Sequence, residues 1–381
     1  MAAPPDDLEI RPLRPGDDPE AQLDLVERAF GSIPAAQRDR QLQSLSWHMA
    51  TGRSLGAFDG RQPAAGASFH DMLQWWHGRP VPMAGVAVVM VAPEYRGRGV
   101  GGRLMTAVLD EIAARGYPLS ALFPATMPLY RSLGWELAGA RDTVIIPARS
   151  LRGLAAPDAA VSGPDAGPDP VLRRAGPGDA DAVIAVLGRV HEAARDCGPI
   201  TRDAATVAAS GRTVRAFWAH LGSYASTAEK VYARTGPASA LWWLTRERDI
   251  GIERRSRWML RVVDAAAAIA ARGYPAEVSV RVRVRIADGA RPANSGRWQL
   301  TVAGGAGTLE RLGPDASGSP AGPAGLGSTA LALGARGLAS LYAGTPLVTL
   351  RQAGLVAGGT PADDAALDAA FAATPYMLDA F

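Results

Sequence analysis

Cysteine occurs once in the 381 residues, as Cys197, and lysine occurs once, as Lys230. A single cysteine excludes a disulfide framework and a cysteine metal site within one chain. The basic residues are therefore almost all arginines. They are spread along a chain whose formal charge is only +3, a pattern that does not indicate nucleic-acid binding.

Long hydrophobic runs are also missing. No apolar stretch approaches the roughly 18 residues that a membrane-spanning helix needs, and the N-terminus, MAAPPDDLEI, lacks the basic and apolar regions of a signal peptide. We therefore expect a soluble, cytoplasmic protein with neither a membrane nor a nucleic-acid partner. The histidines show no paired ligand spacing, so we expect no metal site and place them on the surface or in the core: His48, His70, His77, His191 and His220.

The length and an apolar fraction of 48% predict two or three domains, each with its own core. Residues 152–170 and 312–328 are rich in Pro, Gly, Ala and Asp, as is typical of linkers and long loops. Segments 10–30 and 172–190 resemble each other, which suggests a duplication, although such strand–turn–helix openings are common. Asp17 and Asp179 stand where a helix N-cap is expected.

The apolar periodicity predicts a mixed α/β fold. In the first section we expect strands at 8–13, 54–59, 66–76, 82–92 and 119–123, with helices at 18–30, 36–50, 101–115 and 127–133. A hairpin turn is expected at 77–80. Strict alternation from Val278 to Arg285 predicts a later strand with valines on one face, and the C-terminus should be a helix followed by an extended tail.

The segment RGRGVGG (96–102) lies between an apolar strand pattern and a helix pattern. Gly97, Gly99 and Gly102 fit the dinucleotide-binding motif G-x-G-x-x-G. A dinucleotide fold also needs an acid about 20 residues later, and LSALFPAT contains none. Arg96, Gly99 and Gly101 fit R-x-x-G-x-G, a pyrophosphate loop in which glycines and a helix N-terminus offer backbone N–H groups. The alternative is an ordinary glycine-rich turn before a helix.

Wider segments carry a resemblance to a known family. VAPEYRGRGVGGRLM and ALFPATMPLYRSLGWELAG resemble motifs A and B of the GNAT acetyltransferases, and RWMLRVVDAAAAIAARGYP resembles the entry to the third domain of the Eis-type N-acetyltransferases. The resemblance covers essentially the whole chain. It implies a catalytic GNAT domain (1–151), a second, degenerate GNAT-like domain (152–255) and a C-terminal domain like sterol carrier proteins (256–381). It also implies a homohexamer.

The resemblance further implies acetyl-CoA as co-substrate and assigns residues that bind it. The strand before the loop would offer backbone N–H groups to the acetyl carbonyl and pantetheine, although its residues would equally serve as core. The positions are Val89, Met90 and Val91 in the strand, Arg96, Gly97, Arg98, Gly99, Val100, Gly101 and Gly102 in the loop, and Ala125 and Thr126 after the next strand.

The same resemblance implies the acid and the base. Tyr130 stands where the family has its general acid, and a phenol with a pKa of about 10 suits protonation of a leaving thiolate. The α-carboxylate of Phe381 would act as general base, directly or through water. One departure is Ala380, since the best-known aminoglycoside-modifying members have an acid there; Asp379 is one step earlier. This departure removes the acid that binds polycationic substrates in those members.

The expected function is an acetyl-CoA-dependent N-acetyltransferase that acts on a primary amine by direct attack on the thioester. The amine would be a small polyamine or aminoglycoside-like molecule, or a lysine side chain. The alternatives are a lipid or small-molecule binding module and an inactive GNAT scaffold. Phe30, Trp47, Trp75 and Trp76 would line an aromatic acceptor pocket or belong to the core.

Overall fold

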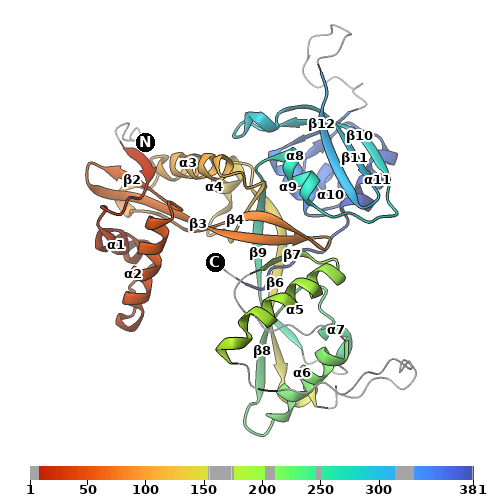
Figure 1. Cartoon of the computed structure of the whole chain (residues 1–381), viewed down its shortest axis with the longest axis horizontal. Helices are drawn as coiled ribbons and strands as arrows, with labels where there is room; N and C mark the ends of the chain where they lie inside the picture. Colours follow the sequence, from red (N-terminus) through yellow and green to blue (C-terminus); the bar gives the residue numbers. More distant parts are fainter. Residues whose placement is uncertain are drawn as a thin grey trace.

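The computed structural model describes residues 8–152, 154, 173, 176–201, 211–245, 250–313, 330–379 and 381. These residues form a large sheet with strands between residues 9 and 262 and a smaller sheet with strands between residues 280 and 357. The last strand of the large sheet (Gly251–Val262) crosses the expected boundary between residues 255 and 256. In Figure 1 the described part of residues 265–371, coloured cyan to blue, forms a separate body beside the large sheet, and the green second section extends away from both.

The large sheet has nine strands in the order β1-β2-β3-β4-β5-β9-β6-β8, with β7 paired to β3. Every pairing is antiparallel except that of β4 with β5, which is parallel. The strands are β1 (Glu9–Pro12), β2 (Ser54–Asp59), β3 (Gln62–Trp76), β4 (Arg79–Val91), β5 (Leu119–Leu122), β6 (Glu136–Pro147), β7 (Cys197–Thr201), β8 (Lys230–Thr235) and β9 (Gly251–Val262).

Helices cover both faces of β4. Val89 packs in the core beneath α3, whereas Met90 packs with Leu25 of α1, and successive strand residues point to opposite faces. The helices of the first two sections are α1 (Pro19–Phe30), α2 (Ala35–Ala50), α3 (Val100–Ala114), α4 (Met127–Ser132), α5 (Ala180–Ala193), α6 (Gly211–Ser223) and α7 (Leu241–Leu244).

Several elements agree with the sequence predictions to within a few residues. The stripe Leu104, Val108 and Ile112 of α3 is fully buried, and Gly116 follows the helix with φ +79. The β3–β4 hairpin turns at His77 and Gly78, both with positive φ, as a two-residue turn of this kind requires.

The N-cap prediction at Asp17 is wrong. Asp18 caps α1 by accepting a hydrogen bond from the backbone N–H of Glu20, while Asp17 binds both Arg11 Nη atoms at 2.7 Å and accepts from the backbone N–H of Arg14. Which of the two adjacent aspartates caps the helix depends on Arg11, six residues before Asp17. This arginine lies outside the helix, so the helix pattern gives no information about it.

The second section repeats this arrangement. Asp179 precedes α5 without a side-chain cap, binds both Arg173 Nη atoms at 2.6 and 2.8 Å and accepts from the backbone N–H of Gly176. The same six-residue and three-residue spacings therefore close the same turn in both segments, as a duplication would produce.

The third section has a five-stranded sheet in the order β12-β11-β10-β13-β14, covered by helices. Val280, Val282 and Val284 are buried and alternate with exposed arginines as predicted, but the strand begins at Val280, not Val278. The elements are α8 (Ala265–Ala271), β10 (Val280–Ala287), β11 (Gly296–Ala303), β12 (Ala306–Arg311), β13 (Leu331–Gly334), α9 (Ala335–Tyr342), α10 (Leu347–Gln352), β14 (Val356–Ala357) and α11 (Pro361–Phe371).

A buried arginine joins the third section to the large sheet. The guanidinium of Arg272 lies 5.0 to 5.6 Å from the ring centroids of Trp76, Tyr274, Tyr342 and Phe371. It donates to the carbonyl oxygens of Tyr342 and Phe371. Because Trp76 belongs to β3, this cluster fixes the third section against the hairpin of the first.

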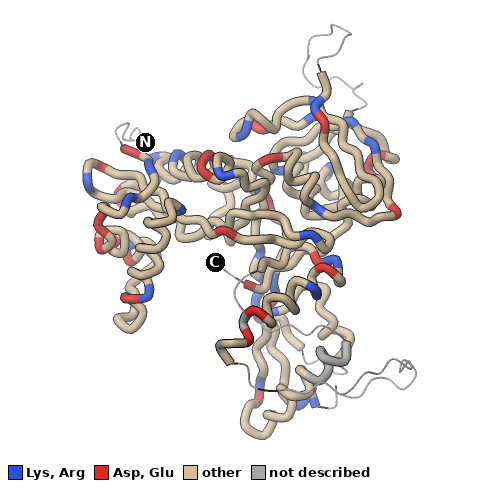
Figure 2. The backbone as a smooth tube through the Cα atoms, viewed as in Figure 1, with Lys and Arg blue, Asp and Glu red and all other residues tan. Residues whose placement is uncertain are grey.

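Charged residues of both signs are interspersed over the described part of the backbone (Figure 2). Among the described residues, no helix has the length and apolar character needed to cross a membrane.

Candidate active site

Strand β4 contains a bulge at the position where its parallel neighbour ends. The pairing of β4 with β5 stops at Val86 and Leu122, although β4 continues to Val91. Val88 has φ +52, a strained conformation for a β-branched residue, and the register with β3 shifts at this point. From Ala87 to Val91, β4 therefore has no described strand beside it on the β5 side, which leaves backbone groups available to a ligand.

The predicted strand positions Val89, Met90 and Val91 lie on this open stretch. Val89 is partly buried and Met90 is 7% exposed, so their side chains also serve the core. The two interpretations of these residues are compatible, because side chains and backbone groups of one strand can serve separate purposes.

The glycine loop leads from this strand into α3. Gly97 and Gly99 have φ +73 and +78, and Gly99 occupies the N-cap position of α3 with no side-chain cap. A Cβ atom at Gly97, Gly99 or Gly102 would meet no atom within 4 Å, so the loop is open on that side. The first N–H groups of the 15-residue helix are thus presented at an unobstructed, electropositive end.

The two arginines of the loop are placed differently. Arg96 donates from Nε to the carbonyl oxygen of Val91 at 3.1 Å, which ties the start of the loop to the end of β4. The guanidinium carbon of Arg98 lies 5.8 Å from the ring centroid of Tyr95. Val100 is 1% exposed and packs in the core, so it anchors the loop instead of facing a ligand.

The strand, the loop and α4 meet at Gly101. A Cβ atom there would lie 3.4 Å from Cγ2 of Val91 and 3.7 Å from Cδ2 of Leu129. Leu129 precedes Tyr130 in α4, and Thr126 occupies the N-cap position of that helix, directly after Ala125. The structure therefore brings the end of β4 and the loop together with α4, the helix that Ala125 and Thr126 precede.

Tyr130 is 5% exposed, and its ring meets that of Trp135 edge to face at 6.4 Å. Burial raises the pKa of its phenol above the usual value, so the hydroxyl stays protonated at neutral pH. The hydroxyl is therefore available as a proton donor at neutral pH.

The C-terminal tail follows α11 and crosses the large sheet. Tyr376 forms a bridge with Ala140 of β6, and its backbone N–H donates to the carbonyl oxygen of Cys197 at 3.1 Å. Further along, Nη1 of Arg141 donates to the carbonyl oxygen of Leu378 at 3.2 Å. Contacts from β6 and β7 therefore fix the path of the tail.

Glycines allow this close approach. A Cβ at Gly198 would lie 2.6 Å from the carbonyl oxygen of Tyr376, and one at Gly236 would lie 2.9 Å from Cγ of the same residue. A Cβ at Gly139 would collide with the carbonyl oxygen of Pro375. Side chains at these three positions would exclude the tail.

The tail ends with Phe381 against the centre of the sheet. Its ring lies 6.3 Å from that of His70 on β3 and 6.0 Å from that of Phe123, which follows β5. A Cβ at Gly85 of β4 would lie 2.8 Å from Cε2 of Phe381. Phe381 therefore packs on the same strand that opens two residues later, at Ala87.

The surroundings of the tail are basic. Burial, together with the nearby Arg234 and Arg254, lowers the pKa of Arg141, while Asp379 acts in the opposite direction. Arg141 also lies 4.8 Å from the ring centroid of Phe123, so it contacts both the tail and the ring against which Phe381 packs. Ala380 lies outside the described residues.

Of the four aromatic residues expected to line an acceptor pocket or to belong to the core, two are buried and two are exposed. Trp75 and Trp76 are buried at 8% and 0% exposure, whereas Phe30 and Trp47 are 59% and 50% exposed. His48 is buried and lies 4.7 Å from His70, ring to ring, so a histidine pair stands beside Phe381. Within the described residues no cluster of three metal-ligating side chains occurs.

Sequence reasoning missed Gly85, His70, Phe123 and Arg141. Only Gly85 carried a signal, because a glycine inside an otherwise apolar strand often marks a close approach by another segment.

Family models match two parts of the chain. Residues 9–138 match the acetyltransferase (GNAT) domain, and residues 265–378 match the sterol carrier protein domain. The first match contains the loop, the open stretch of β4 and Tyr130. The second contains most of the tail.

Similar proteins extend over almost the whole length. A GCN5-related N-acetyltransferase from Kribbella flavida is 38% identical with a TM-score of 0.86, and the match covers 98% of each chain. An uncharacterized N-acetyltransferase from Streptomyces avermitilis is 28% identical over 91% of this chain and 93% of its own. Eis1 from Mycobacterium abscessus shares the fold, with 23% identity, a TM-score of 0.71 and coverage of 98% and 100%.

Proposed function

Because the chain belongs to the GNAT N-acetyltransferases and has the Eis-type architecture, we propose that it transfers the acetyl group of acetyl-CoA directly to a primary amine. The observation that carries the proposal is the convergence on β4. The open stretch Ala87–Val91, the loop at Gly101 and the ring of Phe381 all lie on or against this one strand.

The loop and the strand would bind the donor. The N-terminus of α3 and the backbone N–H groups of Gly97 to Gly102 bind the pyrophosphate, with charge supplied by Arg96 and Arg98. The open backbone of Val89 to Val91 binds the pantetheine and the thioester carbonyl, with Ala125 and Thr126 on the opposite side. Donors fixed in this way would also stabilise the negative charge that develops on the carbonyl oxygen.

Proton transfers at two residues complete the reaction. The α-carboxylate of Phe381 accepts a proton from the substrate ammonium, directly or through water, and the amine nitrogen then attacks the thioester carbon. The new C–N bond forms, the C–S bond breaks, and the departing thiolate takes the proton of the Tyr130 hydroxyl. A phenol whose pKa is raised by burial remains protonated for this step. The attached nitrogen then loses its extra proton, which returns to the Tyr130 phenolate through water.

The positive charge near the C-terminal tail limits which acceptor amines can bind. Arg234 and Arg254 both pair with Thr143 across the sheet, and Arg141 is two residues further along the same face. Three neighbouring cations oppose a polycationic substrate. We therefore favour a small amine with a single positive charge, or a lysine side chain, over aminoglycosides.

The three sections would divide the work. Residues 1–151 would bind acetyl-CoA and contain Tyr130. Residues 152–255 would form walls of the substrate pocket and support the C-terminal tail, and residues 256–381 would supply the terminal carboxylate. The paired Arg–Asp turns at Asp17 and Asp179 support the view that the first two sections arose by duplication. A homohexamer is the assembly that the family resemblance favours, and analytical ultracentrifugation tests it.

The test is a thiol-release assay with acetyl-CoA on a panel of polyamines, aminoglycosides, arylalkylamines and lysine peptides. The protein with a free C-terminus is compared with a variant lacking Phe381, a variant with a C-terminal tag and a control with an N-terminal tag. We expect the first two alterations to abolish turnover while calorimetry still detects acetyl-CoA binding. Normal turnover by the C-terminally tagged protein would overturn the base assignment, and no turnover with any amine would overturn the proposed reaction.

A further inference from the structure

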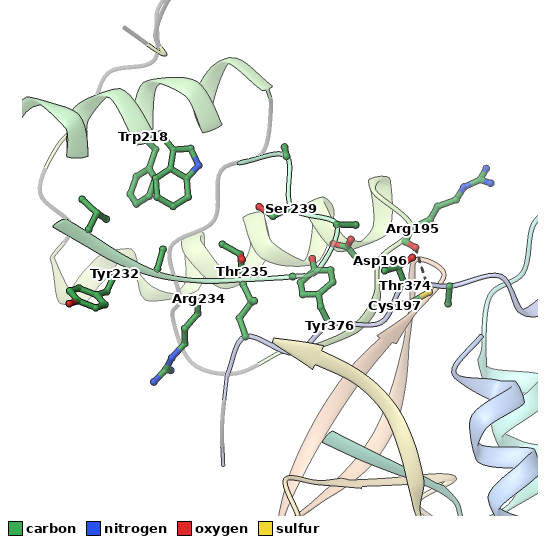
Figure 3. A pocket seen from close by; sticks show the side chains of 18 of the residues that line it. Arg195, Asp196, Cys197, Trp218, Tyr232, Arg234, Thr235, Ser239, Thr374 and Tyr376 are labelled. Carbon is green, nitrogen blue, oxygen red and sulfur yellow. Dashed lines mark hydrogen bonds between the residues drawn. The ribbon is translucent and has the colours of Figure 1, made fainter. Parts of the chain in front are cut away.

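A cavity of about 780 Å³ lies in the second section, away from the glycine loop. Figure 3 shows it between α6 and β8, with the C-terminal tail as a third wall. Its volume is within the range typical of small-molecule sites, roughly 300 to 1,000 Å³. Its walls are mainly apolar and aromatic, and they include Trp218, Leu221, Val231, Ala233 and Tyr376.

Two residues of this wall have a buried polar atom with no hydrogen-bond partner among the described residues, Thr235 with Oγ1 and His77 with Nε2. Thr235 is 4% exposed, and its Oγ1 forms no hydrogen bond within the part of the chain that the structure describes. Figure 3 shows its side chain on the same side of β8 as Trp218. A buried hydroxyl normally has a partner, because leaving it unpaired costs free energy. A ligand in the cavity would provide that partner.

The charged residues at the cavity do not require a charged ligand. Arg234 points to the opposite side of β8, and Arg195 extends away from the cavity (Figure 3). Asp196 already binds Nδ1 of His191 at 2.7 Å. The remaining surface is mostly apolar, and Oγ1 of Thr235 and Nε2 of His77 are its unpaired polar atoms among the described residues.

We propose that this cavity binds a small, uncharged, mainly aromatic molecule with one hydroxyl or N–H group that hydrogen-bonds to Thr235 Oγ1. Thr374, Tyr376 and Leu378 of the tail line the cavity, and the same tail ends at Phe381. Binding therefore changes the position or mobility of the terminal residue and so the rate of acetyl transfer. The coupling rests on the proposed function, whereas the binding does not.

Calorimetry with 2-naphthol as the probe tests the site in the full chain without acetyl-CoA. Naphthalene, which lacks the hydroxyl, is the matched probe. Thr235→Val keeps the side-chain shape and removes the hydroxyl, and Thr143→Val is the control, because Thr143 pairs with Arg234 on the face that points away from the cavity. We expect saturable binding of 2-naphthol that weakens about three- to tenfold in Thr235→Val and is unchanged in Thr143→Val. Naphthalene should bind the wild type and Thr235→Val equally.

Absence of saturable 2-naphthol binding by the wild type, up to the solubility limit of the probe, would overturn the site. Equal affinity of the wild type and Thr235→Val would overturn the role of Thr235. In the thiol-release assay, saturating 2-naphthol should change the rate of the wild type, and an unchanged rate would overturn the coupling. Since binding is measured without turnover, an inactive protein would refute the proposed function and leave the calorimetric result intact.

Discussion

Gly85→Ala is the substitution that tests most directly whether Phe381 works at the reacting centre. Gly85 lies in the middle of β4, and a Cβ added there would stand 2.8 Å from Cε2 and 3.0 Å from Cδ2 of Phe381. Gly85 is not among the residues with positive φ, so alanine fits its backbone without strain. The effect should therefore come from the contact with the terminal ring.

The size of the effect follows from the distances. Carbon atoms in contact prefer a separation of about 3.5 to 4.0 Å, so the ring must move by about 1 Å. Met72, whose Sδ would also lie 2.9 Å from the new atom, has a flexible side chain that can turn aside. A displacement of about 1 Å in a catalytic group can lower the rate about a hundredfold. We expect kcat to fall by about tenfold to a hundredfold.

The assay is steady-state thiol release, with the affinity for acetyl-CoA measured separately by calorimetry. Gly251→Ala is the matched control, since Gly251 lies in β9 of the same sheet and an added Cβ there meets no atom within 4 Å. We expect the control to keep wild-type kcat and both variants to keep wild-type affinity for acetyl-CoA. If kcat of Gly85→Ala stays within about twofold of wild type, Phe381 does not act at the amine.

Three further changes test other parts of the structure. Tyr130→Phe should lower kcat by about a hundredfold or more with little change in KM. Because burial raises the pKa of Tyr130, kcat of the wild type should not decline with rising pH until the pH exceeds the ordinary tyrosine pKa of about 10. A fall in kcat near pH 8 would contradict the assignment of Tyr130 as the acid. Gly99→Ala forces φ +78 on an alanine and should weaken acetyl-CoA binding about tenfold in calorimetry, whereas unchanged affinity would argue against the loop. Glu136 forms ion pairs with Arg131 and Arg336, and these partners lower its pKa although burial acts in the opposite direction. The ionised carboxylate therefore stabilises the fold at pH values above the ordinary pKa of Glu. This contribution is lost as the pH falls through the lowered pKa of the folded protein. Glu136→Gln should cost about 1–2 kcal/mol at pH 7 and flatten the acid limb of a denaturation series, and an unaltered acid limb would refute the role of this pair.

Local patterns account for most of what the sequence predicted correctly. The stripe on α3 repeats at helical spacing, and the His77–Gly78 turn joins two apolar runs, so each element is encoded within a few neighbouring residues. The glycine loop likewise stands next to the helix that it precedes. Its position at the N-terminus of α3 could be predicted for this reason.

Contacts between distant residues account for what the sequence did not reveal. The tail is held by Arg141, which donates to Leu378 across 237 positions, and Thr235 faces a cavity whose third wall comes from the C-terminus. No periodicity or spacing records such contacts. The mechanism proposed for Phe381 came from family resemblance, and Gly85 gave only a general indication of close packing.

The three glycines that the C-terminal tail approaches closely have a consequence for the order in which the protein folds. Gly139 comes from the first section, while Gly198 and Gly236 come from the second, and the tail itself leaves the third. Its docking groove therefore exists only after all three parts have folded and met. Docking of the last residues is therefore the final step of folding, and a partly folded chain has no complete active site. During refolding, enzyme activity should recover later than secondary structure.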